Sequence, residues 1–233
     1  MSKKNKEGFE TRAIHAGQKA DPTTGAVMMP IYTSSTFEQE SPGVHKGFDY
    51  SRSINPTRKA FEECIASLEN GEVGFGFSSG VAAISACVEL LAPGDHVIAM
   101  NDLYGGTVRL FNEIKTLSQG IEVTYVDMTD LQNVKSAKTD KTKMIFVETP
   151  TNPLLRVVDL SAIAEFAKTE GILSVCDNTF ASPYVQQPLN HGIDIVLHSA
   201  TKYLGGHSDL IAGALVIGKK DDELVSRMAN IVN

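Results

Sequence analysis

The sequence predicts an α/β protein built on a mostly parallel sheet. Short apolar runs at 96–100, 144–147 and 195–197 have the length and composition of buried strands. Stretches with helical spacing separate these runs, and such alternation favours right-handed βαβ units whose strands are parallel. A chain of 233 residues is long enough to bury one sizeable core.

The first 50 residues differ from the rest, because glycine, proline, serine and threonine recur there without periodic apolar positions. Such a segment buries little by itself and is expected to lie across another surface. We therefore divide the chain into an extended arm, 1–50, that contacts a partner subunit, and a large domain, 51–233.

The large domain begins with a turn at Asn55-Pro56, after which Thr57 is expected to cap a helix. Strands and helices then alternate to the end of the chain. Strands are expected at 73–77, 96–100, 121–126, 144–147, 172–176, 195–197 and 212–217, and helices at 57–70, 78–91, 107–117, 130–137, 159–167 and from 221 onward.

A lysine follows the apolar run at 195–197, at the exit of a buried strand. An ammonium is costly to bury, so Lys202 calls for an explanation. One is covalent: a desolvated lysine loses its proton readily and forms a Schiff base with an aldehyde. Ser199 and Thr201 flank Lys202 with hydroxyls that can hold a phosphate, so the stretch suggests a pyridoxal phosphate (PLP) site. The alternative explanation of the same residues is a lysine at the end of a strand that reaches solvent, with the hydroxyls capping a turn.

The strand before this one delivers Asp177 at its carboxyl end. A PLP enzyme needs a carboxylate on the pyridine nitrogen, because the protonated ring is the better electron sink. Asp177 also suits an Asx-turn or a helix cap, which is common for aspartate after a strand. Asp177 and Lys202 together are much stronger evidence for a PLP site than either residue alone.

Three further candidates also follow predicted strands. Gly80 opens a helix, and the backbone N–H groups at such a helix start form an anion site. Tyr104, beside two glycines, has room to lie flat against a ring, and Asn152 points an amide at the same edge. Tyr104 packed over a helix start and Asn152 as a turn residue are the plainer interpretations. Because functional groups of parallel sheets collect beyond the carboxyl ends of strands, the common location predicts one site.

Two residues before the first turn, Tyr50 and Arg52, alternate along an extended segment. Arg52 can make a planar, bidentate contact to a phosphate. A surface salt bridge is the more common role of an arginine. A glycine pattern at Gly74, Gly76 and Gly80 resembles a dinucleotide fingerprint, but its last spacing is one residue too long and its first two glycines lie within the strand.

Composition excludes several classes of function. A net charge of -7 argues against nucleic-acid binding, and no apolar run is long enough to span a membrane. Cys64, Cys87 and Cys176 are far apart and form no CxxC, which fits a reducing cytoplasm and predicts neither a metal site nor a disulfide framework.

Five segments, taken in chain order, match the sequence motifs of one known family. They are YSRSINPTR at 50–58, YGGT at 104–107, ETPTNP at 148–153, DNTFASPY at 177–184 and HSATKYLGGHSD at 198–209. Together they resemble the Cys/Met-metabolism PLP-dependent enzymes, nearly end to end. The resemblance implies the large domain of the fold type I, aspartate-aminotransferase-like architecture. Its closest match is to the trans-sulfuration enzymes cystathionine γ-synthase and cystathionine γ-lyase.

The resemblance also implies roles for residues. Lys202 would bind the cofactor covalently and move protons, Asp177 would pair with the pyridine nitrogen, and Tyr104 would stack on the ring and assist proton transfer. Ser199, Thr201, Gly80 and Val81 would bind the phosphate, and Asn152 would lie near the phenolic oxygen. Tyr50 and Arg52 would reach the phosphate of a neighbouring subunit, in a homotetramer built from dimers that share active sites.

The implied reaction is γ-replacement or γ-elimination on amino-acid substrates such as cystathionine, O-acyl-homoserine and cysteine. O-Acetylhomoserine sulfhydrylase and cystathionine β-lyase are alternatives within the family. Gly106 argues against methionine γ-lyase, which has a cysteine there.

Two departures from the family pattern are notable. Ile54 replaces a glycine in the arm, and members of the family continue into a smaller C-terminal domain beyond the position of Asn233. That domain supplies an arginine for the substrate carboxylate. A truncated, catalytically incomplete PLP-binding domain is therefore a second hypothesis. An NAD-dependent oxidoreductase has only the imperfect glycine pattern in its favour.

Overall fold

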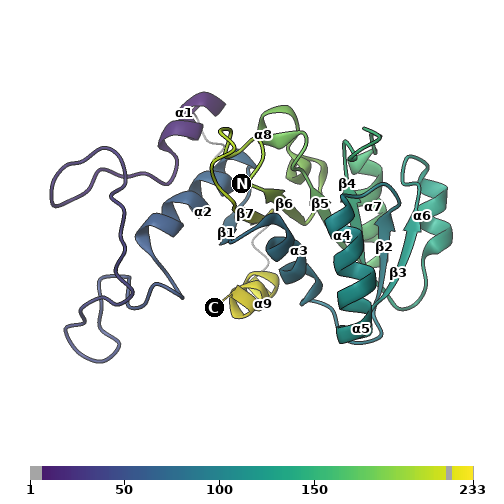
Figure 1. Ribbon diagram of the computed structural model, residues 1–233, viewed down its shortest axis with the longest axis horizontal. Coiled ribbons are helices and arrows are strands. Elements are labelled where there is room, and N and C mark those ends of the chain that lie inside the picture. Colours follow the sequence, from purple (N-terminus) through teal and green to yellow (C-terminus); the bar gives the residue numbers. More distant parts are fainter. Residues whose placement is uncertain (1–6, 219–221, 233) are drawn as a thin grey trace.

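The structure, a computed structural model, describes residues 7–218 and 222–232. Its centre is a seven-stranded sheet with the order β1-β7-β6-β5-β4-β2-β3 (Figure 1). β7 is antiparallel to both of its neighbours, and all other strand pairs are parallel. The prediction of a mostly parallel α/β sheet is therefore confirmed. The strands are β1 (Val73–Phe77), β2 (His96–Met100), β3 (Glu122–Val126), β4 (Thr142–Glu148), β5 (Leu173–Asp177), β6 (Ile195–Ser199) and β7 (Gly213–Ile217).

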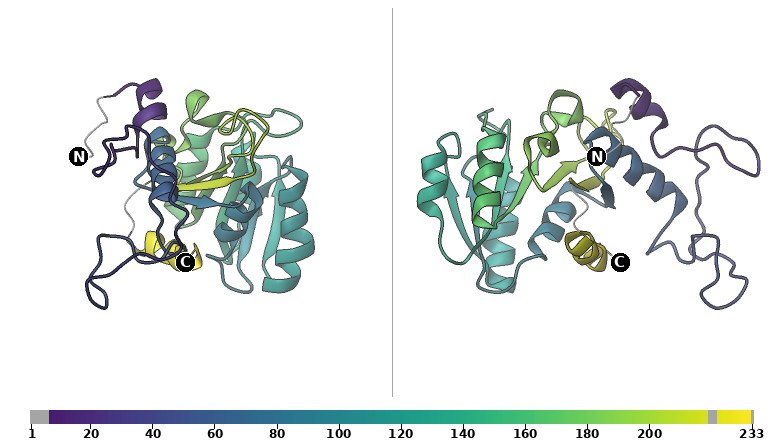
Figure 2. Two further views of the ribbon diagram at one scale, coloured as in Figure 1. Left: turned by 60° about the vertical axis from the view of Figure 1, so that its left-hand side comes forward. Right: turned by 180° about the vertical axis from the view of Figure 1, so that it is seen from behind.

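Helices cover both faces of the sheet. α3 (Gly80–Val88), α4 (Gly105–Arg109) and α9 (Asp222–Val232) lie on the face turned to the viewer in Figure 1, and α7 (Leu160–Glu170) covers the opposite face, seen from behind in Figure 2. α2 (Pro56–Leu68) packs through Ile65 and Ala66 on Ala214 and Val216 of β7. Parallel strands covered on both sides are apolar throughout, and all five residues of β2 are buried.

Helix caps explain several element boundaries. Asn55 caps α2 by accepting hydrogen bonds from the N–H groups of Thr57 (2.8 Å) and Arg58 (3.3 Å). The prediction that Thr57 caps this helix is wrong, because Pro56 occupies the first helical position and the cap is therefore Asn55, two residues before Thr57. Asp130 caps α6 (Leu131–Ala137) and Asp159 caps α7 as expected.

The helical stretch expected at 107–117 is present but not uniform. It begins with α4, continues as a π-helical segment (Leu110–Lys115) and ends with α5 (Thr116–Gln119). Two short elements after β5, α8 (Ser182–Val185) and a 3₁₀ turn (Pro188–His191), were not predicted.

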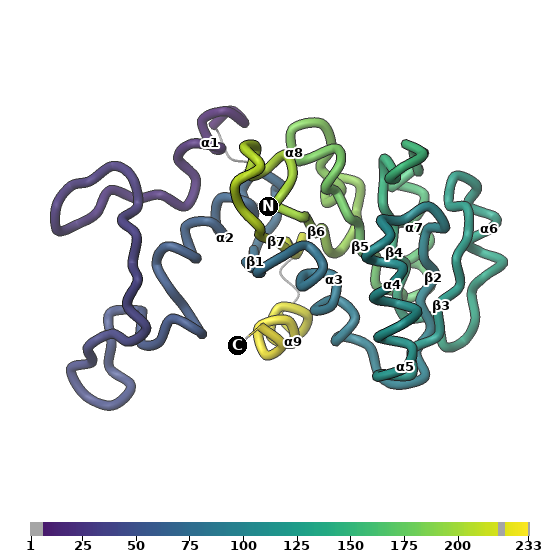
Figure 3. The backbone as a smooth tube through the Cα atoms, viewed as in Figure 1, coloured from purple at the N-terminus to yellow at the C-terminus, as the bar shows by residue number. Residues whose placement is uncertain are grey.

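The arm has one helix within its described part, α1 (Phe9–His15), which was not predicted. Arg12 attaches α1 to the end of α2, because its buried guanidinium donates to the Ser67 carbonyl and to Asn70 Oδ1 (2.9 Å). The rest of the arm extends away from the sheet as loops (Figure 3). Contact between the arm and a partner subunit stays a prediction. In the described ranges, we find no helix of the length and apolarity that crossing a membrane requires.

Candidate functional site

The carboxyl ends of β4, β5 and β6 form one edge where most of the predicted site residues gather. The register pairs Glu148 with Asp177, and Asp177 with Leu197, so three strands end side by side. Side chains of paired residues in parallel strands point to the same face, and alternate residues share that face. Glu148, Asp177 and Ser199 therefore meet on the face that α3 covers.

Asp177 is buried at this edge, with 7% of its surface exposed. Its Oδ1 accepts from the Thr179 N–H (3.0 Å) and the Thr179 hydroxyl (2.5 Å). The same hydroxyl accepts from the Ser199 N–H (2.8 Å), so Thr179 joins the ends of β5 and β6. Burial raises the pKa of Asp177, and the Thr179 hydrogen bonds oppose that rise. In the described structure the hydrogen bonds to this carboxyl all go to Oδ1, which leaves Oδ2 for another donor.

Glu148 is a second buried carboxyl beside Asp177, and no sequence pattern selects it as a site residue. Its Oε2 accepts from the Tyr104 N–H and its Oε1 from the Asn152 N–H, both at 2.9 Å. Burial, together with the charge of Asp177, raises the pKa of Glu148 to about 8. Two adjacent buried carboxyls favour a cationic partner, because an opposite charge nearby stabilises the ionised form. A protonated ring nitrogen is such a partner.

The predicted phosphate site lies where α3 begins. The first N–H groups of a helix, here those of Gly80 and Val81, have no acceptor within the helix. A Cβ atom on Gly80 would lie 2.6 Å from the Ser199 Cβ, so only glycine lets α3 approach β6 this closely. The resulting cradle of N–H groups and a hydroxyl suits a phosphate. The Thr201 hydroxyl instead pairs with the backbone of Ala212, at 3.2 Å.

Lys202 and Tyr104 lie at the open side of the edge. Lys202 is exposed, so the premise that it is a buried ammonium is wrong: the lysine follows the strand by three residues and lies in a turn. Its backbone is fixed by hydrogen bonds to Ser199 O (3.1 Å) and from the Gly206 N–H (2.9 Å). The Tyr104 ring is half-exposed and lies on Gly106, where a Cβ would come within 2.3 Å of the Tyr104 Cε1. This leaves the ring available for stacking.

Tyr50 and Arg52, which are predicted to reach the phosphate of a partner subunit, interact with each other in the single chain. The Arg52 guanidinium donates to the Tyr50 hydroxyl (3.1 Å) and lies over its ring. Gly74 also has a structural explanation. A Cβ atom at this position would lie 2.3 Å from the carbonyl oxygen of Glu62, so only glycine lets α2 pack this closely on β1. The glycine pattern of β1 thus serves helix packing and gives no support to a dinucleotide site.

Comparison with known proteins identifies the class. The family model of the Cys/Met metabolism PLP-dependent enzymes matches residues 10–233, and the chain belongs to this family.

Individual relatives carry three different names. The chain is 58% identical over 213 residues to a cystathionine β-lyase of Coxiella burnetii, covering 91% of this chain and 55% of that protein. It is 50% identical over 219 residues to a cystathionine γ-synthase of Mycobacterium leprae, covering 93% and 56%. A crystal structure of cystathionine γ-lyase from Lactobacillus plantarum, complexed with L-serine, superposes with a TM-score of 0.93 at 50% identity, covering 97% and 58%. The chain spans little more than half the length of these relatives.

PLP is the cofactor of this family, and the residues at the edge fit it. The N–H cradle at Gly80 suits its phosphate, and the open Oδ2 of Asp177 suits its ring nitrogen. The exposed Lys202 amine suits its aldehyde, and in the ranges 7–218 and 222–232 this amine makes no hydrogen bond or ion pair that would compete.

Proposed function

We propose that the protein catalyses PLP-dependent γ-replacement or γ-elimination in trans-sulfuration, as a cystathionine γ-synthase or cystathionine γ-lyase. The proposal rests on one arrangement at one edge of the sheet: a buried carboxyl at the end of β5, a solvent-accessible lysine after β6, and a phosphate cradle where α3 begins against the end of β6. Its substrates would be cystathionine, O-acyl-homoserine and cysteine, and its compartment the cytoplasm.

The residues divide the work as follows. Asp177 Oδ2 would hold the proton on the ring nitrogen, and the Gly80 and Val81 N–H groups with the Ser199 hydroxyl would bind the phosphate. The Thr201 hydroxyl would join them by giving up its pairing with the Ala212 backbone. PLP, when bound, supplies an electron sink for the substrate Cα.

Substrate chemistry falls to side chains at the open side of the edge. Lys202 Nζ would act as the general base that removes and returns the proton at Cα. Lys202 is exposed, so its amine is accessible to a bound substrate. The Tyr104 ring would stack on the cofactor, and Asn152 would lie near its phenolic oxygen. Glu148 holds the backbone of both Tyr104 and Asn152 in place.

Cystathionine β-lyase remains a candidate, because the Coxiella burnetii relative of that name is 58% identical. O-Acetylhomoserine sulfhydrylase is a further alternative within the family. A PLP-binding domain without turnover is the candidate from another class.

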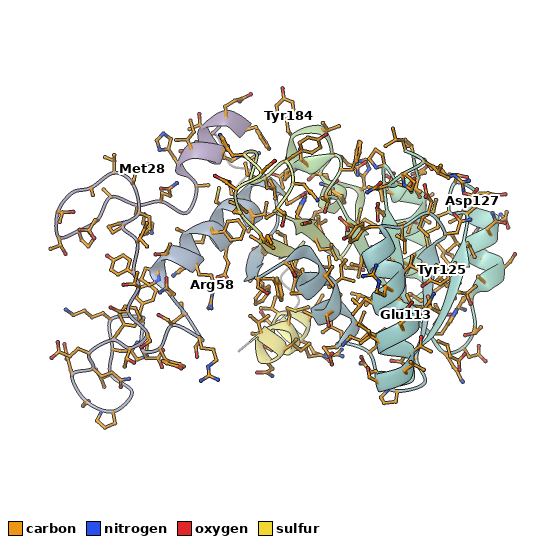
Figure 4. All side chains as sticks on the ribbon, in the orientation of Figure 1. Met28, Arg58, Glu113, Tyr125, Asp127 and Tyr184 are labelled. Carbon is orange, nitrogen blue, oxygen red and sulfur yellow. The ribbon has the colours of Figure 1, made fainter. Side chains whose placement is uncertain are left out.

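Assembly into a homotetramer of dimers is part of the proposal. Apolar side chains are exposed both on the arm, as at Met28 (60%), and beside the site, as at Tyr184 of α8 (72%); both project outward in Figure 4. Exposed apolar surface of this kind marks interaction sites. In such a dimer Tyr50 and Arg52 would reach the partner's phosphate.

The test is the visible spectrum of the purified protein with PLP, before and after L-cystathionine or O-succinylhomoserine. Lys202→Ala is compared with Lys143→Ala, which removes an exposed lysine near the amino end of β4. We expect a band in the parent and in Lys143→Ala that substrate shifts, and an altered or absent band in Lys202→Ala. Analysis of products then separates lyase from synthase. A band that no amino acid shifts favours the PLP-binding domain without turnover, and the absence of any band contradicts the proposal.

A further inference from the structure

A buried polar cluster lies behind the site, on the face that α2 covers. It consists of Glu69, Asn178 and His198, whose exposed fractions are 0%, 0% and 1%. Asn178 directly follows Asp177, and His198 directly precedes Ser199. Because side chains alternate along a strand, the cluster and the cofactor-facing residues occupy opposite faces of the same strand ends.

Glu69 holds the cluster together. Its Oε1 interacts with His198 Nε2 at 2.6 Å and accepts from Asn178 Nδ2 at 2.8 Å. Glu69 is the residue that ends α2, and a carboxylate there faces the negative end of the helix dipole. Burial and the dipole both disfavour this charge, so the histidine and the amide are needed to keep Glu69 in place.

The cluster extends to a third strand. Gln186 donates through Nε2 to Asn178 Oδ1 (3.1 Å) and to the carbonyl of Thr149 (3.0 Å), which directly follows β4. Asn178 returns a bond to the Gln186 carbonyl (2.9 Å). The ends of β4, β5 and β6 are thus joined from behind by side chains that do not touch the cofactor face.

We propose that the Glu69–His198 pair is a positioning unit for the cofactor: it fixes, from behind the sheet, the strand ends that carry Asp177 and Ser199. The pair acts on PLP only through these residues, and the inference rests on the proposed PLP function. Electrostatics adds to the geometry, because the charge of His198 lowers the pKa of Asp177 against the effect of burial.

A purely structural pair would behave differently. It would stabilise the fold equally with and without PLP, and its loss would leave the cofactor affinity unchanged. A positioning pair contributes more when PLP is bound, so its loss weakens PLP binding and reduces the gain in melting temperature that PLP confers.

The experiment compares two buried histidines at opposite ends of the sheet. His198→Asn removes the ring nitrogen that faces Glu69, whereas His198→Gln retains a nitrogen near the position of Nε2. His96→Asn is the matched control: His96 is 3% exposed, at the amino end of β2, and bonds to Thr142 (2.7 Å) and Thr124 (2.9 Å).

PLP affinity is measured by titration of the visible band, and melting temperature is measured with and without PLP. We expect His198→Asn to weaken PLP binding about tenfold, the equivalent of one buried hydrogen bond to a charged group. His198→Gln should recover most of that loss, and His96→Asn should lower the melting temperature without changing PLP affinity.

Equal PLP affinity in all four proteins would overturn the inference while leaving the proposed function intact. Failure of the parent to bind PLP would overturn both. If His198→Asn does not fold, Glu69→Gln carries the same test, because it keeps the shape of the side chain and removes its charge; unchanged PLP affinity in that variant would also reject the inference.

Discussion

The two ends of the central sheet bury polar groups in different ways. At the amino end, Ser174 donates to Asp194 through both its N–H (2.9 Å) and its hydroxyl (2.7 Å), and His96 is bonded at both ring nitrogens. Burial lowers the pKa of His96, so this ring is neutral at pH 7. At the carboxyl end, Glu148 and Asp177 lie side by side in register, and burial raises the pKa of each.

This difference distinguishes polar groups that serve the fold from polar groups that serve a site. Polar groups at the amino end are satisfied by local partners, and this costs the fold little. Two carboxyls buried side by side at the carboxyl end cannot both ionise without cost to the free protein, and such perturbed pairs are typical of a binding or catalytic site. Gains in stability from neutralising substitutions are therefore expected at one end only.

The sharpest test exchanges one aspartate at each end. Asp177→Asn should reduce turnover at least about a hundredfold, comparable to the loss of one preorganised electrostatic group in an active site. Its stability without PLP should be equal or higher, because a neutral amide still accepts from Thr179 and carries no buried charge. Urea unfolding and steady-state kinetics measure the two effects.

Asp194→Asn is the matched variant at the amino end. It should retain turnover and PLP binding but lose about 1 kcal/mol of unfolding free energy, because the bonds from Ser174 no longer end on a charged group. Retained turnover in Asp177→Asn, or lost turnover in Asp194→Asn, would contradict the assignment of the two ends.

A second test concerns the close approach of α3 to β6. Gly80→Ala should lower stability by about 1–3 kcal/mol, the usual cost of overpacking, because its Cβ would overlap Ser199. PLP affinity should fall as well, since the overlap displaces the N–H cradle. Gly76→Ala is the control on the same segment: its Cβ would meet its nearest neighbours at ordinary distances of 3.4 Å. Equal PLP affinity in the two variants would argue against a phosphate at Gly80.

Much of this edge could be predicted from sequence because its information is local. Apolar runs located the seven strands of the sheet, and the rule that parallel strands end at one edge predicts that Asp177 and Lys202 share that edge. The direction of β7 had a signal as well. The described segment between Ser199 and Gly213 contains no helix, whereas the connection between parallel strands usually runs through one.

The remaining features depend on residues far apart in the chain. Glu69 and His198 are 129 positions apart, and neither position has a local signature of a buried pair. From the sequence, Glu148 is only the polar residue at the end of a strand. Its position beside Asp177 follows from the strand register, which the sequence does not specify. Exposure of Lys202 is likewise a tertiary property, since the turn after β6, and not the apolar run, determines where its amine lies.

The last prediction concerns Glu148 and depends on pH. Its pKa is about 8 in the folded protein, against an ordinary value of 4.5, so folding favours the protonated form. The stability that protonation contributes is full below pH 4.5 and is lost as the pH rises through 8, a change of a few kcal/mol at most.

Glu148→Gln removes this titration but leaves either the Tyr104 or the Asn152 N–H facing an amide group that cannot accept. At pH 5 the variant should be less stable than the parent by about 1–3 kcal/mol. The gap should narrow or reverse at pH 9, where the parent carries a buried charge beside Asp177. Urea unfolding at both pH values measures this, with Glu165→Gln on the exposed side of α7 as control. A gap that is the same at pH 5 and pH 9 would mean that Glu148 is not strained by its neighbour, and that the two ends of the sheet differ less than their carboxyls suggest.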